Sequence, residues 1–166
     1  MRPRGRNTGG LAHRARWDGG LSAASDAVEA ALAISVEIES PSLRAEWLTG
    51  LARVRLDQAH LADAARTLLE ALALIDASAV VDAANTLEVV ARLLPRVERP
   101  DVALALFDFS DDYRAEIDSR RRRFDQAEDD DVRSGIDVES AAAPIGLAAA
   151  MALCSGALET VAAGGE

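Results

Sequence analysis

Apolar residues recur every three to four positions from Leu21 onward, with polar residues between them, which is the spacing of amphipathic helices. The pattern predicts helices at Leu21–Val36, Ser42–Leu56, Leu61–Asp76, Val80–Leu94 and Pro100 to at least Ile117. Pro41 and Pro100 support two of these starts, because the first residue of a helix has no N–H bond to lose, and Pro95 closes the fourth helix. The linkers are short, so neighbouring helices are expected to pack antiparallel as hairpins.

A repeat runs through these helices, since the chain matches itself at a shift of 39 residues, the separation between Leu48 and Leu87. The matched positions are Leu48, Leu51, Ala52, Ala64, Leu68 and Ala71 in one unit, and Leu87, Val90, Ala91, Ala103, Phe107 and Ser110 in the other. Small residues among them let two crossing helices approach closely. The segment 23–30 echoes 64–71, so the first helix is expected to be the second half of a further unit. The predicted fold is all-α, with stacked antiparallel hairpins.

Two segments flank the repeats, which are expected to occupy residues 21–135. Residues 1–20 are rich in arginine and glycine and have no apolar period, which predicts a flexible basic tail. Residues 136–166 are expected to form a C-terminal capping helix and tail, with an apolar stripe at Leu147, Met151, Cys154 and Leu158. Because this helix is alanine-rich on all sides, it is also a candidate surface for a second copy of the chain or another protein.

Composition and charge narrow the class of protein. Hydrophobic residues make up 49% of the chain and aromatic residues only 4%, a balance that favours packed helices over sheets. The net charge of -10 argues against general affinity for nucleic acid or an anionic membrane. The single cysteine excludes an internal disulfide, and residues 2–16 lack the apolar core of a secretory signal, so a cytoplasmic location is expected. The uncharged stretch 141–158 is mostly small residues and predicts a buried helix over a membrane span.

One basic cluster is a candidate contact for an anion or a partner, because adjacent guanidinium groups can bind phosphate or carboxylate. It consists of Arg120, Arg121, Arg122 and Arg123. A helix continuing through it would place Glu116, Asp118 and Asp125 four residues from an arginine, so a solvated face that pairs its own charges is the favoured interpretation. The acidic run 128–131 that follows is likewise interpreted as solvated.

Catalytic and metal-binding patterns are weak in this sequence. His13, His60 and Cys154 do not have the spacing of metal ligands, so no metal site is expected. Cys154 is expected to pack as a small hydrophobic residue. All 18 basic residues are arginine, and without lysine or a glycine-rich phosphate loop no nucleotide cofactor is expected. We therefore predict no catalytic residues.

The matched positions resemble the tetratricopeptide repeat. Its first helix has large residues three apart followed by a small one, and its second helix has alanine, a large residue and alanine. The resemblance implies a short right-handed solenoid of helical hairpins. This chain departs from the family in two ways: the usual period of about 34 residues is lengthened in the linker around Ala77–Asp82, and Arg55 stands where an aromatic residue is usual.

A wider stretch, Ser42–Ala162, is similar to the C-terminal repeat region of large actinobacterial regulators of the LuxR, antibiotic-regulator and cyclase-fused ATPase types. In these bacterial proteins the region is a helical sensor or docking solenoid that follows an ATPase module. Their nucleotide-binding and DNA-binding modules have no counterpart in this sequence, so those activities do not carry over. The similarity rests on Ala64–Arg66, Glu70–Leu72, Glu88, Ala91, Arg99–Ala103, Arg114 and Gly146.

Three functional hypotheses follow. The leading one is a non-catalytic interaction module that binds a protein or peptide partner in a regulatory role, without direct contact to nucleic acid or membrane. The alternative is a detached C-terminal sensory or regulatory fragment of a larger ATPase-type transcriptional regulator. The third is a small helical enzyme, which would gain support if the folded chain brought several buried carboxylates together.

Overall fold

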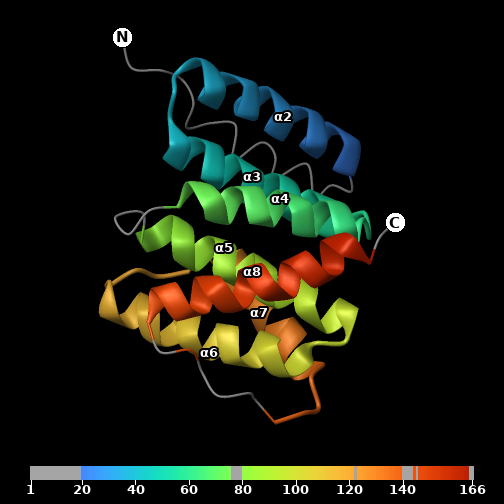
Figure 1. The fold of residues 1–166 in the computed structure, drawn as a ribbon, viewed down its shortest axis with the longest axis vertical. Helices are drawn as coiled ribbons and strands as arrows, with labels where there is room; N and C mark the ends of the chain where they lie inside the picture. Colours follow the sequence, from blue (N-terminus) through green and yellow to red (C-terminus); the bar gives the residue numbers. More distant parts are fainter. Residues whose placement is uncertain (1–19, 76–79, 122, 140–143, 145, 165–166) are drawn as a thin grey trace.

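The computed structural model describes residues 20–75, 80–121, 123–139, 144 and 146–164. All regular elements in these ranges are helical (Figure 1). They are α2 (Leu21–Glu37), α3 (Pro41–Asp57), α4 (Leu61–Leu74), α5 (Val80–Leu93), the 3₁₀ turn η2 (Leu94–Val97), α6 (Pro100–Glu116), α7 (Arg123–Ser134) and α8 (Leu147–Ala163). The prediction of an all-α fold is confirmed for this part of the chain.

Helices α2 to α6 lie one below another in chain order and alternate in direction (Figure 1). Within this stack α3 packs on both α2 and α4, while α5 packs on α3, α4 and α6. Helix α8 crosses the front of the stack in Figure 1 and packs mainly on α4. Helix α7 contacts α5 and lies behind α8 in the same view, so these two helices cover different sides of α5.

The helix starts follow the proline signals in the sequence. Pro41 and Pro100 are the first residues of α3 and α6, and the Ser40 side chain accepts a hydrogen bond from the Leu43 N–H at 3.4 Å. Pro95 lies in η2, directly after α5 ends. Helices α2 to α6 agree with the five predicted ranges within one or two residues wherever the chain is described, whereas α7 was not predicted as a separate helix.

Four helical segments end in the same kind of turn, which contains one residue with left-handed backbone. Glu39, Ala59, Glu98 and Asp118 have φ between 49° and 61°, the left-handed region that glycine usually occupies. The N–H of the residue after each of them bonds to a carbonyl five residues earlier, as in His60 N to Arg55 O at 2.9 Å. These turns reverse the chain within three or four residues, which is why consecutive helices can stack directly on one another.

The core is continuous from α3 to α6 and includes one face of α8. All twelve positions of the 39-residue register are buried, and Phe107 is the largest side chain that is completely enclosed. Cys154 and Leu158 of α8 join the same core, whereas Met151 is half-buried against it. A smaller cluster, formed by Val28, Ala31, Trp47 and Leu51, joins α2 to α3.

Two regions need comment against the sequence predictions. The tail predicted at residues 1–20 lies outside the described residues, apart from Gly20. The prediction that a helix continues through the arginine cluster is wrong, because α6 ends at Glu116 and residues 117–121 are not helical. The left-handed backbone at Asp118 turns the chain there, without glycine or proline. Within the described ranges, none of the helices combines the length and apolar character that crossing a membrane requires.

Candidate functional site

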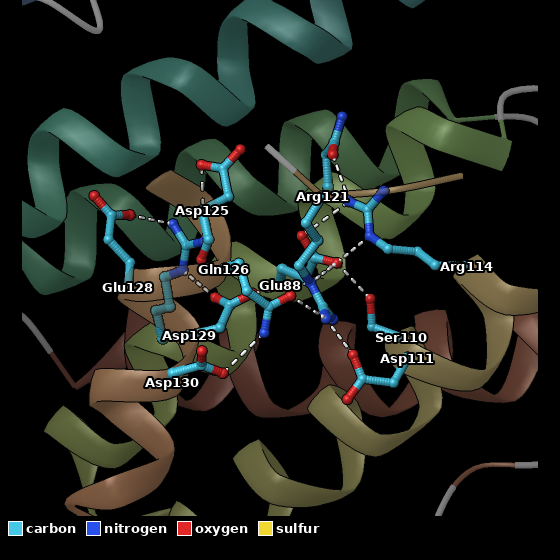
Figure 2. Close-up of polar contacts among 12 residues, drawn as sticks. Glu88, Ser110, Asp111, Arg114, Arg121, Asp125, Gln126, Glu128, Asp129 and Asp130 are labelled. Carbon is cyan, nitrogen blue, oxygen red and sulfur yellow. Dashed lines mark hydrogen bonds and ion pairs between the residues drawn. The ribbon is translucent and has the colours of Figure 1, made fainter. Parts of the chain in front are cut away.

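A cluster of buried charged side chains lies where α3, α5, α6 and α7 meet, and most of it is drawn in Figure 2. Charged residues are seldom fully buried unless they are paired, so a group of this size is the most distinctive chemistry of the fold. We call it the ionic network. Its members are Arg53 on α3, Glu88 and Arg92 on α5, Arg114 on α6, Arg121 in the linker after α6, and Asp125, Glu128 and Asp129 on α7.

Glu88 and Arg114 form the pair that joins α5 to α6. Arg114 donates from Nε to Glu88 Oε1 at 2.5 Å and from Nη2 to Oε2 at 2.9 Å, the two-point geometry that suits guanidinium and carboxylate. The Ser110 hydroxyl donates to the same carboxylate at 2.6 Å, and Asn85 accepts from Arg114 at 2.7 Å. The Glu88 side chain is 1% exposed, so these partners replace the water it would otherwise bind.

Arg92 joins α5 to α7. It donates from Nε to Asp129 at 2.6 Å, from Nη1 to Glu128 at 2.6 Å, and from Nη2 to the backbone carbonyl of Asp125 at 3.1 Å. These three residues are spaced i, i+3 and i+4, so they share one face of α7. Arg53 of α3 adds an ion pair to the Asp125 carboxylate. Helix α7 is therefore attached to α3 and α5 through its acidic face.

Arg121 connects the two halves of the ionic network. Its Nε donates to Glu88 Oε1 at 2.8 Å and lies 3.0 Å from Asp129 Oδ2, while Nη1 binds Asp111 on α6. The side chain is only 6% exposed, although the residue lies in a linker (Figure 2). One guanidinium thus contacts carboxylates of three helices.

Burial affects the two central carboxylates in opposite directions. For Asp129 the cost of burial dominates and raises the pKa above its ordinary value, although the charges of Arg92 and Arg121 act against it. For Glu88 burial also acts to raise the pKa, but the hydrogen bonds from Arg114 and Ser110 and the charge of Arg121 outweigh it and lower the pKa. Keeping Asp129 ionised therefore costs more free energy than keeping Glu88 ionised.

Three buried polar atoms of the ionic network have no hydrogen-bond partner among the residues that the structure describes. They are Arg53 Nε, Arg121 Nη2 and Asp129 Oδ2, the last of which has only its ion-pair contact to Arg121. An unpaired buried donor or acceptor costs free energy. The network thus neutralises its charges without satisfying all of its hydrogen-bonding capacity.

An open pocket of about 460 Å³ lies beside the network. Both acidic and basic side chains line it, so it does not present one sign of charge. The lining residues are Asp111, Arg114, Ala115, Asp118, Ser119, Arg120, Arg121 and Gln126.

The structure separates the four arginines that the sequence grouped together. Arg121 is buried in the ionic network, which corrects the interpretation of a solvated helix face paired at i, i+4. Arg120 is exposed and lines the open pocket. Arg122 and the side chain of Arg123 lie outside the described residues. Contact of the cluster with an anion or a partner stays a prediction.

The acidic run also needs correction. Asp129 is completely buried and binds Arg92, whereas Asp130 and Asp131 are exposed, so only part of the run is solvated. In the described part of the chain no three His, Cys, Asp or Glu residues are grouped to hold a metal ion. The sequence did carry one signal for the network: Glu88 and Arg92 interrupt a run that is otherwise apolar, from Leu87 to Leu94.

Comparison with known proteins gives no match, since no protein-family model, curated protein or solved structure is significantly similar to this chain. Its function is therefore inferred from its own geometry and chemistry.

Proposed function

We propose that this chain is a non-catalytic helical-repeat interaction module that binds a protein or peptide partner. The observation that carries the proposal is the packing of α5, which contacts both helices of the preceding hairpin as well as α6. Stacking of one hairpin on the next is the basis of repeat scaffolds, and such scaffolds use their long faces for binding. The burial of all twelve positions of the register supports a tetratricopeptide-like arrangement of α3 to α6.

The charge distribution supports a protein partner over nucleic acid. The net charge is -10, and the buried arginines Arg53, Arg92, Arg114 and Arg121 already bind carboxylates of the same chain. A phosphate backbone would meet a surface of the same sign. Because the sequence pattern of Ser42–Ala162 resembles the repeat region of bacterial regulators, we place this binding role in regulation. The single cysteine and the pattern of residues 2–16 are the reasons for placing it in the cytoplasm.

A small helical enzyme is the second candidate, and one observation favours it. Glu88 and Asp129 are buried carboxylates that converge on Arg121, and convergence of this kind is common at active sites. However, their side chains are only 1% and 0% exposed, so neither can reach a substrate in this conformation. The interaction module is therefore the better-supported function.

Selection from a displayed peptide library against the folded full chain tests the proposal. We expect enriched peptides that bind the native chain with micromolar or better affinity in titration calorimetry and that do not bind it in urea. An unrelated acidic helical protein serves as the counter-selection. The proposal is overturned if no binder emerges and a panel of hydrolase substrates reveals turnover that Glu88→Gln abolishes.

A further inference from the structure

Arg53 and Arg92 form a cationic face on two neighbouring helices of the stack, α3 and α5. Both guanidinium groups converge on Asp125: Arg53 through its ion pair, and Arg92 through Nη2, which is 3.9 Å from Asp125 Oδ1 and 3.1 Å from its backbone carbonyl. Burial lowers the pKa of Arg53, and the nearby charge of Arg92 lowers it further. Two buried cations this close require acidic partners, so the stack itself creates a site for carboxylates.

The first half of α7 occupies this face. Asp125 pairs with Arg53 and Arg92, Glu128 with Arg92, and Asp129 with Arg92 and Arg121, while Asp130 and Asp131 are exposed. Figure 2 shows Asp125, Glu128 and Asp129 on the same helix. The described contacts of Asp125, Glu128 and Asp129 in this half of the helix are ionic, and such contacts weaken with salt and with competing ions.

The second half of α7 is attached differently. Val132, and Ile136 just after the helix ends, pack against the core, and the Arg133 guanidinium lies 4.9 Å from the centre of the Phe107 ring. Arg133 also donates to Asp111 on α6 at 2.7 Å. The cation–π contact of Arg133 and the packing of Val132 thus lie at one end of α7 and the contacts to Arg53 and Arg92 at the other, so the two halves of the helix are held by different kinds of contact.

The fit between α7 and its site is incomplete. Among the described residues, Arg53 Nε has no hydrogen-bond acceptor, and Asp129 Oδ2 has an ion pair to Arg121 at 3.0 Å but no hydrogen bond. The fully buried Asp129 carboxylate also carries a desolvation cost. A ligand with its acidic groups placed slightly differently could satisfy the spare donor of Arg53, so α7 is not the best possible occupant.

We propose that the face formed by Arg53 and Arg92 is a binding site for an acidic helical segment of a partner protein, and that the first half of α7 is its intramolecular competitor. The proposal rests on the function proposed above and specifies the chemistry of the partner. The segment recognised carries acidic residues at i, i+3 and i+4, the pattern of Asp125, Glu128 and Asp129.

Competition within one chain has a measurable consequence. A tethered competitor acts at a high effective concentration. The apparent affinity for an added ligand therefore equals its affinity for the free site multiplied by the fraction of molecules in which the site is free. Weakening the hold of α7 on the site therefore increases the affinity for an acidic helix in trans. Low salt strengthens the ionic contacts of both α7 and the added helix, so it does not distinguish the two ligands. Substitutions in α7 change only the intramolecular ligand.

The test uses the full chain and a fluorescein-labelled synthetic peptide with the sequence of residues 123–136. Fluorescence anisotropy compares the wild-type chain with D125N/D129N, which removes two carboxylates from the site, and with D130N/D131N, which removes the same charge from exposed positions. We expect D125N/D129N to bind the peptide at least about tenfold more tightly than the wild type. The D130N/D131N control should match the wild type to within about twofold.

Two further controls test whether the peptide binds at Arg53 and Arg92. Adding R53Q and R92Q to D125N/D129N should abolish the gain, and a peptide of the same composition in scrambled order should bind equally weakly to every variant. In case a variant does not fold, hydrogen exchange of the wild-type chain provides an independent measurement. Saturating peptide should then deprotect residues 125–130 and leave α6 and α8 protected.

Equal peptide affinity for D125N/D129N and D130N/D131N would overturn this inference, as would unchanged protection of residues 125–130. The interaction module itself would survive that result if library-selected peptides still bound the chain. If instead neither the acidic peptide nor any selected peptide bound, the proposed function would fail together with the inference.

Discussion

The Arg114 guanidinium on α6 binds both carboxylate oxygens of Glu88 on α5, through Nε at 2.5 Å and Nη2 at 2.9 Å. The two side chains are 6% and 1% exposed, so this pair has exchanged nearly all of its water for protein contacts. Such a pair gives little net stability over an apolar pair of similar volume, but removal of one partner leaves an uncompensated buried charge. The relation between α5 and α6 therefore depends on both residues being present.

Removing one partner of this pair should be far more damaging than removing both. We expect Glu88→Leu to lower the free energy of unfolding by about 3–5 kcal/mol, and E88L/R114L to recover the greater part of that loss. Urea unfolding followed by circular dichroism measures both variants. Arg66→Leu, which breaks an exposed pair with Asp63, is the control and should cost less than about 1 kcal/mol. A double variant no more stable than Glu88→Leu would contradict this account.

Stability should depend on pH in opposite ways at Asp129 and Glu88. The pKa of Asp129 is raised, so the folded chain holds its proton longer than the unfolded chain, and stability falls as the pH rises from about 4 through the raised pKa. Asp129→Asn removes this loss, so its stability relative to the wild type should increase over that window and then level off.

The pKa of Glu88 is lowered, so its contribution to stability is present above the ordinary glutamate value and is lost as the pH falls through the lowered pKa. The deficit of Glu88→Gln relative to the wild type should therefore grow as the pH rises to about 4.5. Urea unfolding in steps between about pH 3 and pH 7 measures both differences. Curves that run parallel for the two variants would show that the assigned directions are wrong.

Helices α2 to α6 were predictable from the sequence, whereas α7 and the pairing within the ionic network were not. Apolar periodicity and Pro41, Pro95 and Pro100 place most helix boundaries, because these signals are local. Arg121 has arginine neighbours, and only the turn at Asp118 decides which of them points inward. That turn has a left-handed residue that is not glycine, so nothing in the local sequence marked it and helix propensity predicted a continuous helix instead.

The left-handed turn at Ala59 should be improved by glycine. Its φ of 61° is strained for a residue with a Cβ, and the side chain is exposed, so Ala59→Gly should raise the free energy of unfolding by about 0.5–1 kcal/mol. Ala33→Gly, at an exposed position inside α2, is the matched control and should lower it by a similar amount. Thermal unfolding of both variants tests the prediction, which fails if the two substitutions shift the midpoint in the same direction.

The thiol of Cys154 should be unreactive in the native chain. Burial raises the pKa of this thiol, and the side chain is fully enclosed in the core beside Leu158. We expect reaction with Ellman's reagent to be on the order of a hundredfold slower in buffer than in urea. Ser22→Cys in a Cys154→Ser background places a thiol on the exposed side of α2 and should react at the same rate in both conditions. Rapid native labelling of Cys154 would mean that α8 opens readily.

The ionic network also imposes an order on assembly. Arg53 and Asp125 lie 72 residues apart in the sequence, and Arg121 contacts carboxylates from α5, α6 and α7 at once. If one of these helices is absent or shifted by a turn, charged side chains of the network remain buried without an ionic partner, which costs free energy. The network therefore favours the arrangement in which α3, α5, α6 and α7 are all in register with one another.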